Sequence, residues 1–208
     1  MKVIAHRGFW TVKQEMNTEA AFRRALDSGF GIETDFRDAG GRLVIAHNPP
    51  VGDEMNADYF FSFARSYVEG IIAINVKADG LQELLTAAAS KLAPDRHFVF
   101  DMSVPDTLRH FATPLPVFVR ASEFEQPGAL LLSRAAGVWL DAFHNEWYTE
   151  ETIAAFRLMG LRVCLVSPEL HCRPHQREWH RLRDWGIAAD DGFLLCTDFP
   201  DQAKDFFR

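Results

Sequence analysis

The sequence predicts a small α/β protein of the (β/α)8, or TIM-barrel, class, folded as a single domain over residues 1–208. Short runs of apolar or β-branched residues alternate with longer amphipathic stretches, which indicates parallel strands joined by crossover helices. The chain contains eight such runs, the number of strands that closes this barrel. No linker, charge break or repeat divides the chain. An open, doubly wound sheet would show the same alternation and is the alternative fold.

The predicted strands are, in chain order, Lys2–Ala5, Gly31–Phe36, Ile71–Val76, His97–Asp101, Pro116–Arg120, Gly137–Ala142, Leu161–Ser167 and Gly192–Cys196. The predicted helices follow them at Thr18–Ser28, Ala57–Tyr67, Leu81–Leu92, Pro105–Phe111, Gly128–Arg134, Thr149–Met159, Pro174–Trp185 and Pro200–Phe207. Local signals support several helix ends. Thr18, Ser103 and Thr149 are each placed to cap a first turn, and Gly29 and Gly160 are placed to end a helix.

The composition is that of a folded globular domain. The chain has 208 residues, a net charge of −7 and 48% hydrophobic residues, which excludes disorder, and its acid excess argues against a nucleic-acid partner. The three cysteines, Cys164, Cys172 and Cys196, have no zinc-binding spacing and are expected to be free thiols. The first residues lack an export signal, and no apolar stretch reaches the roughly 18 residues of a membrane span. We expect a cytoplasmic protein without stable membrane insertion, and the sequence leaves its oligomeric state open.

Polar residues follow the first two predicted strands. The first strand runs into His6 and Arg7, and the second contains Glu33 and Asp35. Because strand side chains alternate between faces, these two carboxylates point the same way. Two acids on one inward face repel each other, and a divalent cation with oxygen ligands, magnesium or calcium, resolves that repulsion. The alternatives are ion-paired surface acids and a solvated loop histidine.

Two further segments complete the predicted site. A turn after the second strand leads into Leu43–Ala46, which predicts a hairpin that returns His47 toward the strand ends. The third strand carries Asn75 and Lys77 on one face. A hard cation, two histidines, an arginine and a lysine suit a phosphate ester, because the cations stabilise the extra charge of the transition state and the imidazoles transfer protons.

Several motifs then occur in a distinctive order: His6-Arg7-Gly8, Asn17-Thr18 ahead of a helix with Ala20, Ala21 and Phe22, Glu33-Thr34-Asp35, and a hairpin that ends at His47. This order resembles the glycerophosphodiester phosphodiesterase family of the phospholipase-C-like phosphodiesterase superfamily, as a divergent member. Thr197-Asp198-Phe199-Pro200 resembles the closing strand-end motif of that family, and Val119–Glu123 resembles its fifth strand end.

The resemblance implies a TIM-barrel phosphoric diester hydrolase of lipid metabolism that acts on a glycerophosphodiester or another small phosphodiester. It implies His6 and His47 as the acid–base pair, Glu33 and Asp35 as metal ligands, and Arg7 and Lys77 near the phosphate. Three positions depart from the family pattern: Glu15-Met16 replaces proline–glutamate, Asn48 replaces an aspartate, and Asn75 replaces the usual glutamate ligand. We expect the Asn75 amide to serve as the third metal ligand.

Two other functions fit the same residues: a catalytically weak or inactive barrel that binds a phospho-ligand, and a metal-dependent lyase or isomerase acting on a phosphorylated sugar. Asp101, Asp141, Glu169 and His171 follow later strands and are candidates to extend the mouth. Trp10, Phe143 and Trp147 are candidates for an apolar wall that faces a lipid or sugar group. The leaving alcohol, the preferred cation and the choice between a cyclic product and direct hydrolysis are not predicted.

Overall fold

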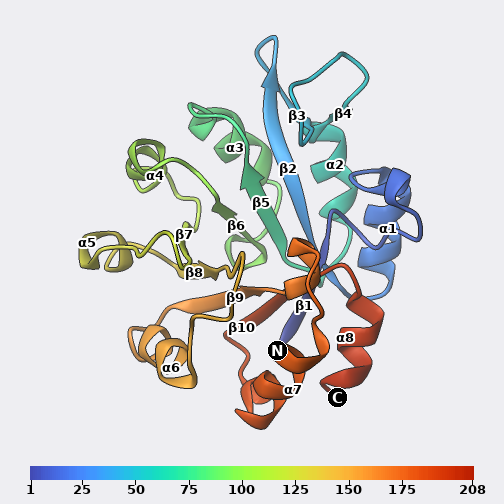
Figure 1. Ribbon diagram of the computed structural model, residues 1–208. Helices are drawn as coiled ribbons and strands as arrows, with labels where there is room; N and C mark the ends of the chain where they lie inside the picture. The colour runs from blue at the N-terminus through green and yellow to red at the C-terminus, as the bar shows by residue number, and fades with distance from the viewer.

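The computed structural model describes all residues from 1 to 208 and shows a ring of parallel strands with the helices outside it (Figure 1). The strands of the ring are, in order, β1 (Lys2–His6), β2 (Gly31–Ala39), β5 (Ile72–Val76), β6 (His97–Phe100), β7 (Phe118–Ala121), β8 (Gly137–Leu140), β9 (Arg162–Val166) and β10 (Phe193–Thr197). Seven of the eight junctions are regular parallel ladders. At the eighth, Val99 and Val117 form a single parallel bridge between β6 and the start of β7. That bridge closes the ring and confirms the predicted barrel.

Eight helices follow the barrel strands, as the alternation predicted (Figure 1). They are α1 (Glu19–Asp27), α2 (Ala57–Ala64), α3 (Gln82–Ala89), α4 (Val104–His110), α5 (Ala129–Leu132), α6 (Glu150–Leu158), α7 (Gln176–Asp184) and α8 (Pro200–Phe206). Short 3₁₀ turns lie at η1 (Lys13–Glu15), η2 (Pro94–Arg96), η3 (Pro168–His171) and η4 (Ile187–Ala189). The predicted caps Thr18, Ser103 and Thr149 each accept a hydrogen bond from a first-turn backbone N–H.

The predicted hairpin is present and extends from β2. That strand continues to Ala39, three residues beyond the predicted end, and pairs antiparallel with β3 (Arg42–Ile45), which in turn pairs with β4 (Met55–Asn56). Gly40 and Gly41 form the two-residue turn with φ of 57° and 79°, the conformation that a tight hairpin requires. The hairpin projects beyond the barrel (Figure 1).

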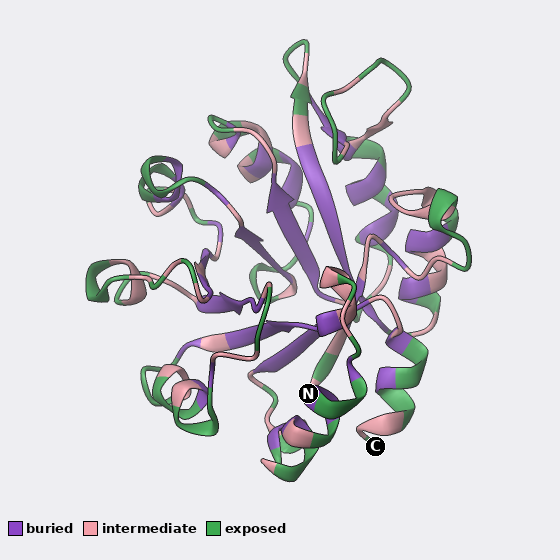
Figure 2. Cartoon of the chain, viewed as in Figure 1, coloured by how far each residue is buried: buried purple, intermediate pink, exposed green.

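The core has two layers. Outward-facing strand residues pack against the helices, and inward-facing residues fill the barrel, so the strands are buried while the helices expose their outer faces (Figure 2). Inside the barrel, Phe100 stacks on Trp139 with 3.8 Å between the ring centroids. Cys164 and Cys196 are buried there as free thiols. No helix in the structure combines the length and the apolar character that crossing a membrane requires.

Candidate active site at the barrel mouth

The inward face of the barrel changes from apolar to polar at the carboxyl ends of the strands. Side chains alternate along each strand, so the residue two positions beyond an inward apolar residue also points inward. Five polar residues occupy such positions: His6 after Ile4, Asn75 after Ala73, Arg120 after Phe118, Asp141 after Trp139, and Asp198 after Cys196. The barrel geometry therefore brings polar groups from strands far apart in the sequence to one mouth.

Asp35, in β2, contributes to this mouth and is fully buried. Its Oδ2 is 3.2 Å from Arg7 Nε, and its Oδ1 is 3.7 Å from Lys77 Nζ. Asn17 donates a hydrogen bond from Nδ2 to Asp35 Oδ2 at 2.9 Å, and its own Oδ1 accepts one from Thr34. Two cations, from the residues that directly follow β1 and β5, thus offset the charge of one buried carboxylate.

Glu33 lies on the same inward face and is almost as deeply buried. Asn75 donates from Nδ2 to Glu33 Oε1 at 2.9 Å, and the backbone N–H of Arg7 donates to Oε2 at 3.3 Å. Burial and the nearby Asp35 charge raise the pKa of Glu33, against the opposing effects of His6, Asn75 and Arg7.

His6 is held between two acids. Its Nδ1 is 2.7 Å from Asp198 Oδ1, and its Nε2 is 3.9 Å from Glu33 Oε2. Burial lowers the pKa of His6, but the Asp198 hydrogen bond and the charges of Glu33 and Asp198 outweigh it and raise the pKa above its ordinary value. Asp198 was absent from the predicted site residues, and its only signal was the strand-end motif that contains it.

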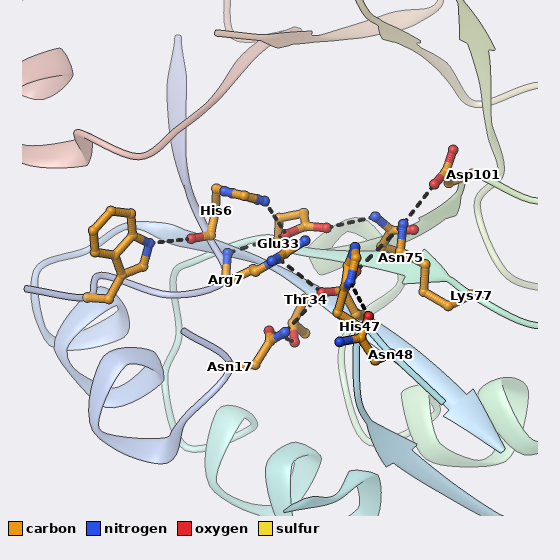
Figure 3. Close-up of polar contacts among 12 residues, drawn as sticks. His6, Arg7, Asn17, Glu33, Thr34, His47, Asn48, Asn75, Lys77 and Asp101 are labelled. Carbon is orange, nitrogen blue, oxygen red and sulfur yellow. Dashed lines mark hydrogen bonds and ion pairs between the residues drawn. The ribbon is translucent and has the colours of Figure 1, made fainter. Parts of the chain in front are cut away.

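His47 occupies a different environment from His6. It is exposed, its ring contacts Asn48 Oδ1 at 3.2 Å, and its carbonyl accepts a hydrogen bond from Arg37. The hairpin nevertheless stays tied to the mouth, because the Ala46 N–H donates to the Asp35 carbonyl at 3.0 Å. The structure thus gathers the predicted residues His6, Arg7, Glu33, Asp35, Asn75 and Lys77. His47 lies beside Asn48 in the loop after β3 and is exposed (Figure 3).

Ion pairs continue around the mouth beyond the predicted site. Lys77 Nζ is 3.0 Å from Asp101 Oδ2, Asp101 also pairs with Arg120, and Arg120 pairs with Glu125 at 2.6 Å. Burial lowers the pKa of Arg120, while Glu125, Asp101 and Asp141 together raise it above its ordinary value. The mouth is therefore a chain of alternating charges that crosses β5, β6 and β7.

The side chains near Asp35 fit a hard divalent cation. Asp35 Oδ1 and Asn75 Oδ1 are both buried and accept no hydrogen bond in the protein. The two residues are paired across β2 and β5, and Glu33 lies on the same face. No group of three or more His, Cys, Asp or Glu side chains is arranged to hold a metal. Beside the two carboxylates, the Asn75 amide oxygen is a further donor that points to this site without a hydrogen-bond partner. Carboxylate and amide oxygens are the donors that Mg²⁺ and Ca²⁺ prefer.

No sequence profile of a known protein family matches this chain, and no curated protein matches it. Several solved structures, in contrast, are similar to this chain along its whole length. A glycerophosphodiester phosphodiesterase from Agrobacterium tumefaciens aligns over 100% of both chains with a TM-score of 0.71 and 19% identity. One from Parabacteroides distasonis aligns over 99% of this chain and 96% of its own, with a TM-score of 0.71 and 17% identity. The chain has the fold of the glycerophosphodiester phosphodiesterases.

A Ca²⁺-dependent phosphatidylinositol-specific phospholipase C from Streptomyces antibioticus is also similar, with a TM-score of 0.58 and 13% identity over 100% of this chain and 96% of its own. The fold that the sequence resemblance implied is therefore confirmed along the full length of the chain. At these sequence identities, the likeness shows a shared fold. The chemistry of this chain depends on the residues at the barrel mouth.

Proposed function

We propose that this protein is a metal-dependent phosphodiester hydrolase that acts on a glycerophosphodiester or a similar small phosphodiester. The observation that carries the proposal is the placement of the His6–Asp198 pair beside the oxygen ligands Glu33, Asp35 and Asn75, with Arg7 and Lys77 at the same strand ends. A proton-transfer group, a cation site and two fixed positive charges are the parts that cleavage of a phosphodiester needs.

Each part has a definite role in this proposal. Glu33, Asp35 and Asn75 would hold a magnesium or calcium ion, which when bound stabilises negative charge on the phosphate oxygens. Arg7 and Lys77 orient the phosphate and offset its charge. The hydrogen bond to Asp198 keeps a proton on His6 Nδ1, so that Nε2 is the atom that accepts or returns a proton. His47 is the second proton-transfer group, on the side of the hairpin.

The first test is turnover. We expect the protein to hydrolyse bis(p-nitrophenyl) phosphate and a glycerophosphodiester in the presence of Mg²⁺, Ca²⁺ or Mn²⁺, and EDTA to stop both reactions. Phosphorus NMR of the products separates hydrolysis from lyase or isomerase chemistry, because only hydrolysis converts the diester into a monoester and an alcohol. Binding of a diester without any turnover would favour the alternative of a phospho-ligand-binding barrel.

Metal binding is tested separately from activity by changing Asn75. Asn75→Glu places a carboxylate where the amide stands, and we expect it to tighten binding of Mg²⁺ or Ca²⁺ by roughly tenfold or more, because affinity follows the number of charged ligands. Calorimetric titration of protein stripped with EDTA measures this. Asn145→Asp adds a negative charge on an exposed loop and should leave the affinity unchanged. Equal affinities for wild type and Asn75→Glu would remove Asn75 from the ligand set.

The role of His47 is tested by His47→Ala, which we expect to lower kcat for phosphodiester hydrolysis by roughly 10²-fold. Because His47 is exposed and its ring contacts only Asn48, the free energy of unfolding should change by less than about 0.5 kcal/mol. A loss of rate would then be chemical rather than structural. His180→Ala, on the exposed face of α7, is the control. A normal kcat in His47→Ala would show that another group supplies the second proton transfer.

A further inference from the structure

A second group of polar and aromatic side chains lies at the mouth and has no role in the proposed hydrolysis. We call this group, Asp141, His171, Phe143 and Phe124, the second wall. Asp141 follows β8, and His171 lies in η3 after β9. In the ring, β8 is four strands away from β2 in either direction, so this wall stands across the mouth from Glu33 and Asp35.

Asp141 and His171 form a pair with free hydrogen-bonding capacity. His171 Nε2 is 2.6 Å from Asp141 Oδ1, which also accepts the Ala142 N–H at 2.8 Å. Asp141 Oδ2 and His171 Nδ1 have no hydrogen-bond partner in the protein, and neither is sealed from solvent. A carboxylate oxygen and a ring nitrogen are thus both available to a ligand, and hydroxyl groups can satisfy both because they donate and accept.

The loop after β8, which carries part of this wall, is held in place by hydrogen bonds from Glu123, Trp147 and Arg173. The Glu123 carboxylate accepts the backbone N–H groups of Phe143 and His144 at 3.1 and 2.6 Å. Trp147 donates from Nε1 to the Asp141 carbonyl at 2.7 Å, and Arg173 donates to the Ala142 carbonyl at 2.6 Å. A binding surface fixed before the ligand arrives loses little conformational entropy on binding.

Aromatic rings extend the wall outward. The Phe143 ring packs on the His171 ring with 4.7 Å between centroids, and Phe124 lies 6.1 Å from Phe143. Phe124 is 71% exposed, although large apolar side chains are usually covered. An aromatic face beside a carboxylate and an imidazole offers one surface to the C–H groups of a ligand and another to its hydroxyls. An acyl chain would leave the polar pair unsatisfied, which is costly.

We propose that Asp141, His171, Phe143 and Phe124 form the subsite for the second alcohol of a glycerophosphodiester, the one joined to the phosphate opposite glycerol, and that this subsite selects a polyhydroxylated alcohol, a polyol or a sugar. The inference rests on the proposed function, because that function places the phosphate at the mouth. It names the class of substrate: a glycerophosphodiester whose second alcohol carries several hydroxyl groups.

The test compares diesters that share a glycerol end: glycerophosphoinositol, glycerophosphoethanolamine and glycerophosphocholine. We expect kcat/KM to be at least tenfold higher for the inositol diester, since a site built to bind hydroxyls discriminates against alcohols that lack them. His171→Ala and Asp141→Ala should remove this preference. Each should lower kcat/KM for the inositol diester by tenfold or more and change kcat/KM for the choline diester by less than threefold. Phe124→Ala should raise KM for the inositol diester.

Asn145→Ala, at an exposed position of the same loop, is the control and should keep the preference. In parallel, saturation-transfer NMR measures the binding of free myo-inositol to the wild type and to His171→Ala. Inositol binding that depends on His171, in a protein that hydrolyses none of the diesters, would overturn the proposed function and support the subsite. Hydrolysis of all three diesters with equal kcat/KM, or an equal loss on all three in His171→Ala, would overturn the subsite and leave the proposed function standing.

Discussion

His6→Ala is expected to lower kcat for phosphodiester hydrolysis by roughly 10²–10⁴-fold, the range for loss of a positioned general acid or base. Of the two proposed proton-transfer histidines, His6 is the one that the fold holds in place, because Asp198 contacts Nδ1 at 2.7 Å and Glu33 lies 3.9 Å from Nε2. KM should change little if the phosphate is bound by Arg7 and Lys77. Steady-state kinetics on bis(p-nitrophenyl) phosphate, with the metal at saturation, measures both constants.

A second variant separates proton transfer from general damage to the mouth. Asp198→Asn keeps the shape of the side chain and removes the charge that favours a proton on His6 Nδ1. Its kcat should fall by less than that of His6→Ala, and the double variant should be no slower than His6→Ala alone, because the two residues act as one unit. Additive losses in the double variant, or wild-type kcat in His6→Ala, would contradict the role of this pair.

The alternation of strands and helices was predictable because it depends on local signals. Side-chain periodicity marks the strands, and Thr18, Ser103 and Thr149 mark helix starts within a few residues. The common face of Glu33 and Asp35 followed from the period of two along β2. Closure of the barrel depends on the bridge between Val99 and Val117, which no local pattern reveals.

The electrostatic partners at the mouth could not be predicted in the same way. Asp198 and His6 are 192 residues apart in the chain, and only the ring closure of the barrel brings them together. The sequence predicted a metal as the counter-charge for the two acids, whereas in the structure Arg7 and Lys77 already offset Asp35. His47 belongs to a loop, where alternation does not fix the direction of a side chain.

Asp35 forms ion pairs with Arg7 and Lys77, so removing its carboxylate should change the free energy of unfolding by a large amount. Asp35→Ala is expected to lower the free energy of unfolding by about 3–5 kcal/mol, because removing one partner of a buried ion pair leaves the other uncompensated. Asp35 is 0% exposed, and the Arg7 side chain that would lose its ion-pair partner is only 23% exposed, whereas Lys77 keeps Asp101 at 3.0 Å. Arg7 Nε is itself buried with no hydrogen-bond acceptor in the protein. Urea unfolding in EDTA, followed by circular dichroism, measures the change without bound metal.

Two comparisons make the Asp35 result specific to its ion pairs. Asp38→Ala removes an exposed acid from the same strand and should change the free energy of unfolding by less than about 0.5 kcal/mol. Arg7→Met combined with Asp35→Leu removes both charges and should recover part of the loss, because an apolar pair of similar volume leaves no buried charge unpaired. A loss below about 1 kcal/mol in Asp35→Ala would mean that Arg7 and Lys77 do not depend on this carboxylate. Arg7 and Lys77 would then not compensate the negative charge of Glu33 and Asp35. The two carboxylates would depend more strongly on a bound divalent cation to reduce their repulsion.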